Sequence, residues 1–232
     1  MTDETEDLDA LVRRVDPDRW LSSRFIADAA ARADVVALYA YDHELARAPK
    51  VASNSLLGEI RLTWWREALD EIFEDRPVRM HPTAQALAAA VRARGLPREP
   101  LETMIDARYR ELDAAPMSAH EALVWARGTG GAAARLAAGL LAPDADPAAA
   151  GAAGAAWMLG RRAGSGAADA AGFAEALANV HEPARRDARG LAVAAFPAIA
   201  HAALAGRLAK GGRPADWSVR LRLVWAVATG RI

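Results

Sequence analysis

Long stretches of helix-forming residues, interrupted by proline, are the feature that most constrains how this chain folds. Alanine, leucine and arginine are abundant and favour helix, whereas runs of β-branched residues are scarce. Proline disrupts a helix interior, so it is expected near helix ends. Prolines lie near most of the expected boundaries, at Pro49, Pro77, Pro97, Pro116, Pro143, Pro147, Pro183 and Pro214. We predict helices near residues 22–47, 54–75, 82–94, 99–113, 118–141, 147–163, 168–180, 188–210 and 215–229.

The domain organisation predicted from this pattern is simple. Residues 1–20 form an acidic N-terminal segment, and residues 21–232 form one helical domain. The chain has no internal repeat, no heptad run and no long polar linker. The segment at 142–147 is short and is interpreted as a turn between helices of one domain. The expected architecture is therefore a single all-α bundle.

Composition and charge exclude several classes of function. Hydrophobic residues make up 53% and charged residues 25%, which is ordinary for a globular domain. The net charge of −1 gives no reason to expect a nucleic-acid partner. Cysteine is absent, so disulfides and thiolate metal sites are excluded. No apolar run reaches the roughly 20 residues that a bilayer span requires. The acidic N-terminal segment also does not resemble a targeting peptide, so we expect a cytoplasmic protein.

The segment at 54–75 has the clearest amphipathic periodicity. Its expected N-cap is Ser53. The predicted apolar face consists of Leu57, Ile60, Trp64, Ala68 and Ile72. A dense acidic run follows on the same helix, at Glu67, Asp70, Glu71, Glu74 and Asp75. Such a run is typical of a solvated face rather than of a metal site.

Residues 38–50 carry the strongest resemblance to a known family. Their sequence Leu-Tyr-Ala-Tyr-Asp-His-Glu-Leu-Ala-Arg-Ala-Pro-Lys resembles the first metal-binding segment of squalene/phytoene synthases. In that family the helix ends in Asp-Asp-x-x-Asp, whose carboxylates hold magnesium against a diphosphate. The corresponding positions here are Ala46, Arg47 and Lys50. Magnesium requires oxygen ligands, and two cations would repel it.

The resemblance extends over roughly Arg24 to Leu141 and continues faintly beyond. It includes the Trp-Arg segment at 64–66, the Glu111-Leu112 pair and the glycine-containing stretch from Trp125 to Gly131. The family's second aspartate motif would follow Gly154. There, Met158 replaces the family's glutamine. The next positions are Arg161, Arg162, Gly164 and Ser165, and only Asp169 aligns loosely with a family carboxylate.

A subgroup of the family shows a similar loss of aspartates. It includes a mitochondrial assembly factor for respiratory complex I and bacterial relatives, whose first motif reads approximately Ala-Phe-Asn-x-Glu-Leu-Ala. Residues 40–46 read Ala-Tyr-Asp-His-Glu-Leu-Ala and resemble that version more than an aspartate-rich one. The resemblance implies an isoprenoid-synthase helical bundle with a central apolar cavity. It also implies a non-catalytic or altered role.

Candidate site residues follow from this comparison. No residue is assigned a catalytic role and no metal site is assigned. The candidates for the cavity and the remnant site are Tyr41, Asp42, Glu44, Arg61, Trp65, Arg108, Glu111, Met158 and Arg162.

For each group an ordinary structural role competes with a functional one. Asp42 and Glu44 would bind a metal, or lie at a solvated helix end with an ion pair to Arg47. Glu111 would face the cavity or form a surface salt bridge.

The arginines near Trp64 and Trp65 carry a second pair of alternatives. Arg61 and Arg66 would recognise a diphosphate or lipid headgroup, or pair with Glu67 and Asp70 beside packed tryptophans. A further ion pair is expected between Asp106 and Arg110, four residues apart on one helix.

Two functions are expected from the whole sequence. The first is a catalytically degenerate family member that binds a hydrophobic or isoprenoid ligand, or docks a protein partner in respiratory-complex assembly. It needs no cofactor. The alternative is an active prenyl transferase of the phytoene or squalene type, with magnesium held by displaced carboxylates, so transferase activity is left open. Trp217 and Trp225 near Arg220 and Arg222 additionally suggest peripheral membrane contact. The helical spacing of the two tryptophans is equally well explained by a C-terminal helix that faces the core.

Overall fold

Every regular element of the protein is helical within residues 7–50, 54–211 and 215–232, the part that the computed structural model describes. The α-helices are α1 (Leu8–Val15), α2 (Pro17–Ser23), α3 (Ala29–Lys50), α4 (Ser55–Phe73), α5 (Pro82–Arg94), α6 (Arg98–Tyr109), α7 (Ala119–Ala126), α8 (Ala132–Leu141), α9 (Ala148–Ala163), α10 (Ala170–Asp187), α11 (Ala205–Leu208) and α12 (Asp216–Thr229). Short 3₁₀ segments are η1 (Arg110–Leu112), η3 (Ala188–Gly190), η4 (Val193–Ala198) and η5 (Ala200–Leu204), and η2 (Arg127–Gly131) is a π-helical turn. The predicted all-α class is confirmed.

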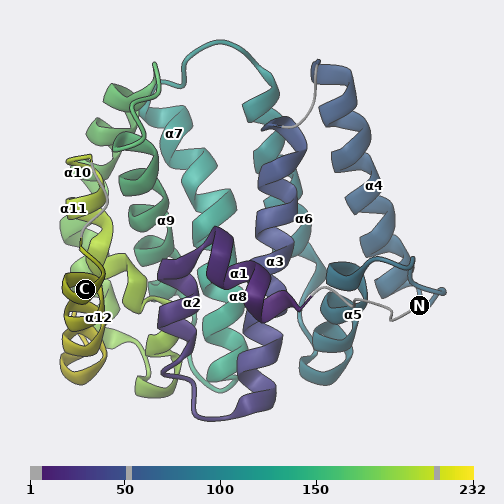
Figure 1. Ribbon diagram of the computed structural model, residues 1–232, viewed down its shortest axis with the longest axis horizontal. Coiled ribbons are helices and arrows are strands. Elements are labelled where there is room, and N and C mark those ends of the chain that lie inside the picture. Colours follow the sequence, from purple (N-terminus) through teal and green to yellow (C-terminus); the bar gives the residue numbers. More distant parts are fainter. Residues whose placement is uncertain (1–6, 51–53, 212–214) are drawn as a thin grey trace.

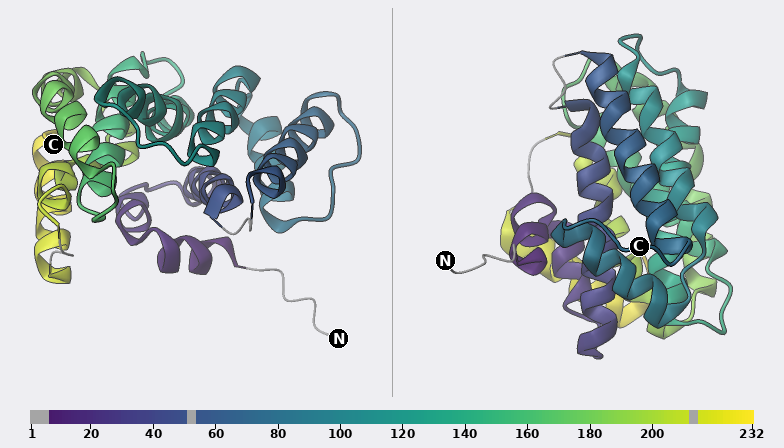
Figure 2. Two further views of the ribbon diagram at one scale, coloured as in Figure 1. Left: turned by 90° about the horizontal axis from the view of Figure 1, so that it is seen from above. Right: turned by 90° about the vertical axis from the view of Figure 1, so that its right-hand side faces the viewer.

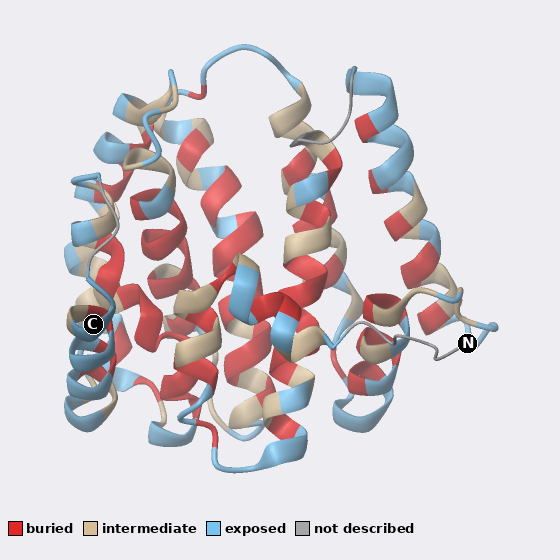
Figure 3. Ribbon diagram, viewed as in Figure 1, coloured by how far each residue is buried: buried red, intermediate tan, exposed pale blue. Residues whose placement is uncertain are grey.

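Two long helices organise the bundle. α3 packs against α1, α4, α5, α6 and α8, while α9 packs against α7, α8, α10 and α11. α4 lies at one edge of the molecule, and α10, α11 and α12 lie at the opposite edge (Figures 1 and 2). Buried positions concentrate on the helix faces toward the middle, and both edges expose much of their surface (Figure 3).

The start of the chain is part of this bundle. The Asp7 side chain caps α1, and the Asp16 side chain caps α2, whose first residue is Pro17. Val12 is fully buried, and α1 packs against α3. Both helices lie largely within the segment that we expected to precede the domain. The first six residues lie outside the described part.

Several predicted boundaries agree with the structure and others do not. α5 spans the predicted residues 82–94, and the helix expected at 22–47 is divided into α2 and α3. The region 188–210 consists mainly of 3₁₀ segments. α3 includes Pro49, and α10 continues through Pro183, because neighbouring buried residues such as Ala48 and Ala184 pack against the core. Pro214 lies outside the described residues.

The predicted apolar face of α4 is wrong in its first half. Leu57 and Ile60 are exposed, and Trp65 is buried instead of Trp64, which is half-buried. The observed buried face consists of Gly58, Leu62, Trp65, Ala68, Leu69 and Ile72. At the edge of the bundle, neighbouring helices rather than periodicity decide which apolar residues are covered. Asn54 caps the helix, because its side chain accepts a hydrogen bond from Leu57 N; Ser53 lies outside the described residues.

The helix predicted at 118–141 is one rod with a π-helical turn in it. The capping box of Ser118 and Glu121 begins α7, as the sequence pattern indicates, and η2 connects α7 directly to α8. Glycine is required in η2, since a Cβ on Gly130 would lie 2.6 Å from the carbonyl oxygen of Gly154 on α9. The rod and α9 therefore approach each other closely beside the candidate site.

No helix in the described ranges combines the length and the hydropathy that crossing a lipid bilayer would need.

Candidate functional site

The two segments that match the family's metal-binding motifs line the same cavity. The cavity has a volume of about 290 Å³ and lies between α3, α6, α7 and α9. Its lining consists of Val15, Asp16, Asp42, His43, Ala46, Arg108, Glu111, Trp125, Met158, Arg161, Arg162 and Ser165. Ala46 represents the first motif, while Arg161, Arg162 and Ser165 represent the second. The lining mixes charged and apolar residues, whereas the resemblance implied an apolar cavity.

Asp42 is the centre of the charged lining. Its side chain projects from α3 and is held between two arginines, with Arg19 Nη1 at 2.5 Å and Arg108 Nη2 at 2.7 Å. All three residues are buried. Burial alone would raise the pKa of Asp42, but the charges of Arg108 and Arg19 outweigh it and hold the pKa well below the ordinary value. Asp42 is therefore an anion whose two oxygens are both engaged.

Arg108 extends this cluster toward η1 and α7. Its Nη1 lies 2.6 Å from Glu111 Oε1, and the same oxygen accepts a hydrogen bond of 2.9 Å from Trp125 Nε1. Burial opposes the charge of Arg108, but Glu111 and Asp42 together raise its pKa. A shared arginine thus ties α3 to the end of α6.

The second motif contributes cations rather than carboxylates. Arg161 Nη1 lies 3.1 Å from Asp16, which caps α2, and Arg162 Nη2 lies 3.3 Å from Asp169. Both arginine side chains keep over a third of their surface exposed, at 39% and 34%. The one carboxylate that aligned loosely with the family motif is therefore occupied by an arginine.

An aromatic wall supports Arg19 from the other side. Its guanidinium lies 4.4 Å from the ring centroid of Trp157 and 5.0 Å from that of Tyr39. The Trp157 ring meets His201 edge-on at 4.7 Å. Burial, with Arg19 and Arg161 nearby, lowers the pKa of His201 well below its usual value, so the imidazole is neutral.

The donor set at this cavity does not fit the magnesium ions that the fold family implies. Magnesium prefers several oxygen ligands, usually carboxylates and water. Asp16, Asp42, Glu111 and Asp169 each pair with an arginine instead. In the described part of the chain, no group of three or more histidines and acids is arranged to hold a metal.

The structure brings together five of the nine predicted site residues. Asp42, Arg108, Glu111, Met158 and Arg162 all line the cavity. Asp42 is buried, so its expected alternative as a solvated helix end is wrong.

The other four predicted residues lie away from the cavity. Tyr41 donates to the Leu101 carbonyl oxygen at 3.0 Å and stacks edge-on with Trp65 at 5.3 Å. Glu44 pairs with Arg47, as one alternative proposed, and Arg61 is exposed on α4.

Three expected ion pairs are wrong. Arg66 pairs with Asp106 instead of the α4 acids, and Asp70 pairs with Arg98. Arg110 pairs with Glu121 rather than with Asp106. In each of these pairs the observed partner lies on a different helical segment. The interpretation of the α4 acidic run as a solvated face agrees with the structure at Glu67, Glu74 and Asp75, which are exposed. Asp70 and Glu71 are instead half-buried in ion pairs with Arg98 and Arg79.

Sequence reasoning missed the residues that complete the cluster from the N-terminal helices. Arg19 and Asp16 come from the segment placed outside the domain, Trp157 comes from the helix predicted at 147–163, and His201 comes from the region 188–210. The Asp16-Pro17 pair is a helix-start signal that could have extended the domain toward the N-terminus. No comparable sequence signal identifies His201.

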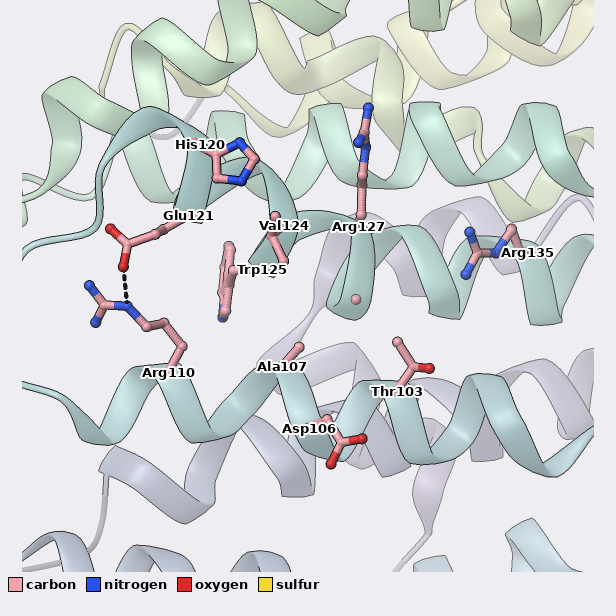
Figure 4. A pocket seen from close by; sticks show the side chains of 11 residues that line it. Thr103, Asp106, Ala107, Arg110, His120, Glu121, Val124, Trp125, Arg127 and Arg135 are labelled. Carbon is pink, nitrogen blue, oxygen red and sulfur yellow. Dashed lines mark hydrogen bonds and ion pairs between the residues drawn. The ribbon is translucent and has the colours of Figure 1, made fainter.

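A larger groove lies on the other side of Trp125. It has a volume of about 640 Å³ and runs between α6 and the α7–η2 rod (Figure 4). Ala107, Val124 and Trp125 line its middle, and the Arg110–Glu121 pair stands at one end. None of the predicted site residues lines this groove.

Comparison with solved structures supports the fold. The chain superposes on a dehydrosqualene synthase crystallised with a ligand, with a TM-score of 0.70 over 97% of this chain and 95% of that one. The sequence identity is 14%, so this likeness shows the shared fold alone.

Curated relatives match a shorter region. The chain is 33% identical over 103 residues to a protein of Bos taurus named NADH dehydrogenase (ubiquinone) complex I, assembly factor 6, and 31% identical to the protein of that name from Homo sapiens. The match covers 44% of this chain and 30% of each relative. Residues 12–190 match the family model described as squalene/phytoene synthase. This chain, with its two motif segments facing one charged cavity, therefore belongs to the squalene/phytoene synthase family.

Proposed function

We propose that this protein is a catalytically degenerate member of its family that acts as an assembly factor by binding rather than by prenyl transfer. The observation that carries the proposal is the charge at the cavity. Where active relatives concentrate carboxylates, the cavity presents Ala46, Arg161 and Arg162, and both oxygens of Asp42 are bound by arginines. Such a lining supplies no electrophilic clamp for a leaving diphosphate.

The alternative of an active prenyl transferase requires displaced carboxylates to carry the metal. Asp42 and Glu111 are the acids at the cavity that this reading would use, and arginine holds each of them within 2.7 Å. Freeing them would leave Arg108 buried without a counter-charge, which costs several kcal/mol. Glu44 pairs with Arg47 and does not line the cavity. The contacts thus favour the binding role.

The proposed protein partner is a component of a respiratory NADH dehydrogenase. Support comes from the relatives, which are named as assembly factors of that complex. They are matched over less than a third of their length, so the partner is inferred from the shared region alone.

The same shared ancestry makes a hydrophobic or isoprenoid ligand a second proposal. The volume of the cavity, about 290 Å³, lies near the lower limit for small-molecule sites.

The first experiment tests for prenyl transfer. The purified chain is incubated with farnesyl or geranylgeranyl diphosphate and magnesium, beside an active family member as a positive control. We expect no hydrocarbon product and no heat of magnesium binding by calorimetry. Product formation that disappears in Asp42→Asn, with the variant still folded by circular dichroism, would establish the transferase instead.

The second experiment tests the assembly role in the source organism. Deleting the gene is expected to lower the amount of assembled NADH dehydrogenase on native gels, and re-expressing the chain is expected to restore it. A tagged copy should co-purify with subunits or intermediates of that complex. Unchanged amounts of the complex after deletion, with no co-purifying subunit, would contradict the proposed partner.

A hydrophobic ligand is tested separately by native mass spectrometry of the protein purified without detergent. A bound isoprenoid or lipid should add a discrete mass that organic extraction removes. A spectrum of apoprotein alone, from cells that make isoprenoids, would remove the ligand from the proposal.

A further inference from the structure

A second cavity lies at the edge of the molecule, and the turn after α11 that helps to form it packs against Gly164 in the second motif segment. It has a volume of about 720 Å³ and is formed by α10, α11, α12 and the turn after α11. Its charged lining consists of Arg185, Arg207, Lys210 and Arg222, together with half-buried His181. We refer to it as the basic pocket.

The basic pocket has an excess of positive charge. Among the residues that the structure describes, no aspartate or glutamate side chain lines it. Arg185 is partly neutralised, since it pairs with Glu182 at 3.0 Å and donates to the Ile232 main-chain oxygen at 2.8 Å. Arg207, Lys210 and Arg222 are exposed and form no ion pair within the described residues. This contrasts with the central cavity, where arginines are matched by acids.

α12 presents an apolar stripe next to this pocket. Its buried face, with Val219, Leu223 and Ala226, already packs on the bundle. The outward face nevertheless carries four large apolar side chains, with exposed fractions of 69% for Trp217, 61% for Leu221, 51% for Val224 and 48% for Trp225. These residues recur at steps of three and four, so they form a continuous stripe along the helix. An exposed stripe of this kind indicates an interaction surface.

The stripe and the basic pocket share residues. Arg222 and Trp225 line the pocket, and they also line a shallow hollow with Trp217, Ser218 and Leu221. α12 lies along the outside of the bundle (Figures 1 and 3). Exposed apolar and cationic groups are therefore combined on one surface.

We propose that this surface binds membranes containing anionic phospholipid. A lipid phosphate enters the basic pocket, where Arg207, Lys210 and Arg222 supply unpaired donors. Trp217, Leu221 and Trp225 insert at the level of the headgroups, where tryptophan is favoured. A free phosphate would be held by the cations alone, whereas the adjoining apolar stripe matches a ligand with a phosphate attached to hydrocarbon.

The membrane site is separate from the proposed assembly role. It shares no residue with the central cavity. A variant that no longer binds membranes should give the same results as the parent in the prenyl-transfer assay and in the co-purification. Failure of one proposal is therefore distinguishable from failure of the other.

The test is co-sedimentation with vesicles. The chain is mixed with sucrose-loaded vesicles of phosphatidylcholine, alone or with phosphatidylglycerol, at low and high salt. We expect strong binding only to the anionic vesicles, weakened by salt because the interaction is partly electrostatic. Brominated acyl chains in the same vesicles should quench tryptophan fluorescence.

Two variants examine the two parts of the surface. R207Q/K210Q removes two cations near the lipid and should weaken partitioning into anionic vesicles about 30-fold, given the usual contribution of each basic residue. W217S/W225S removes the inserted rings and should abolish quenching by brominated lipid. The altered side chains are exposed, so thermal unfolding should show that both variants remain folded.

Matched controls come from other surfaces of the molecule. R61Q/R127Q removes the same charge from exposed positions on α4 and η2, and L56S/I60S removes exposed apolar residues from α4. Both controls should bind like the parent. Equal binding of parent and R207Q/K210Q, or no sedimentation with anionic vesicles, would overturn the proposal. A thermal shift with inorganic phosphate but no vesicle binding would also overturn it, and would identify a soluble phosphate compound as the ligand.

Discussion

The central cluster around Asp42 and the surface cluster around Arg79 are built from the same parts. In the centre, Arg19 pairs with Asp42 and lies 4.4 Å from the Trp157 ring centroid. In the segment after α4, Arg79 pairs with Glu71 of α4 and lies 4.3 Å from the ring centroid of Trp64. The difference is exposure. The Arg19 and Asp42 side chains are 2% and 5% exposed, whereas Arg79 and Glu71 are 18% and 15% exposed and Glu67, a second partner of Arg79, is 61% exposed.

That difference decides what each cluster contributes. Water screens the surface pairs, and such pairs usually stabilise a protein by about 0–1 kcal/mol. In the buried cluster a missing partner leaves a charge without solvent, and the cost rises to about 3–5 kcal/mol. Ion pairs between the same residue types therefore differ in how much their loss lowers the free energy of unfolding. Four substitution experiments test this contrast.

The largest effect is expected from Arg108→Met. It leaves Glu111 without its cation and removes one of the two partners of Asp42. We expect the free energy of unfolding, measured by urea denaturation, to fall by about 3–5 kcal/mol. Arg61→Met is the control on an exposed position and should change it by less than about 0.5 kcal/mol. A loss below 1 kcal/mol for Arg108→Met would show that water reaches the cluster.

A double substitution tests whether the buried charges act as one unit. Arg19→Met removes one of the two arginines that hold Asp42, and Asp42→Leu leaves Arg19 with only Asp16 at 3.8 Å. The double variant removes both members of the pair. The double variant should cost less than the sum of the single variants, by about 0.5–3 kcal/mol. Additive costs in the same urea measurements would mean that the pairing contributes little.

The pH dependence of stability should report on His201. Its pKa is lowered in the folded state, so the unfolded chain binds the proton more readily below its ordinary pKa of about 6.5. Stability is therefore complete above that pH and falls as the pH drops toward the folded pKa, by up to about 1.4 kcal/mol per pH unit. His201→Gln should flatten the slope between pH 6.5 and 5.5. An identical slope in the variant would assign the dependence to other groups.

The smallest effect is expected from Arg79→Met, in the segment that follows α4. Its partner Glu71 has a lowered pKa because of hydrogen bonds from Arg79, but Glu67 is largely solvated. We expect a loss of about 0.2–1 kcal/mol, and the loss should shrink at high salt. A salt-independent loss comparable with that of Arg108→Met would erase the distinction between the two regions.

Much of the fold could be predicted because it depends on local chemistry. Proline, glycine and capping residues placed α5, α9 and the start of α7 to within about a residue. Prediction was poorer where tertiary packing overrides local preference. The 3₁₀ segments at 188–204 and the passage of α10 through Pro183 have no distinct local signal.

The candidate site was predictable only in part. The motif positions identified Asp42, Glu111, Met158 and Arg162, because the family resemblance places them on helices that face each other. Arg19 and His201 were missed since they come from segments more than 150 residues apart. Nothing in a linear pattern indicates that both would lie against Trp157.

The amino-acid sequence by itself determined the helical class and the replacement of the expected carboxylates by alanine and arginine, since both are properties of residue type and spacing. Only the tertiary structure decided that Asp42 is an occupied buried anion and that Arg161 and Arg162 share its cavity. It also decided that Arg207, Lys210 and Arg222 have no acidic partner among the described residues. The physical reason is that the energy of a charge depends on the water and the counter-charges around it, and packing of distant segments sets both.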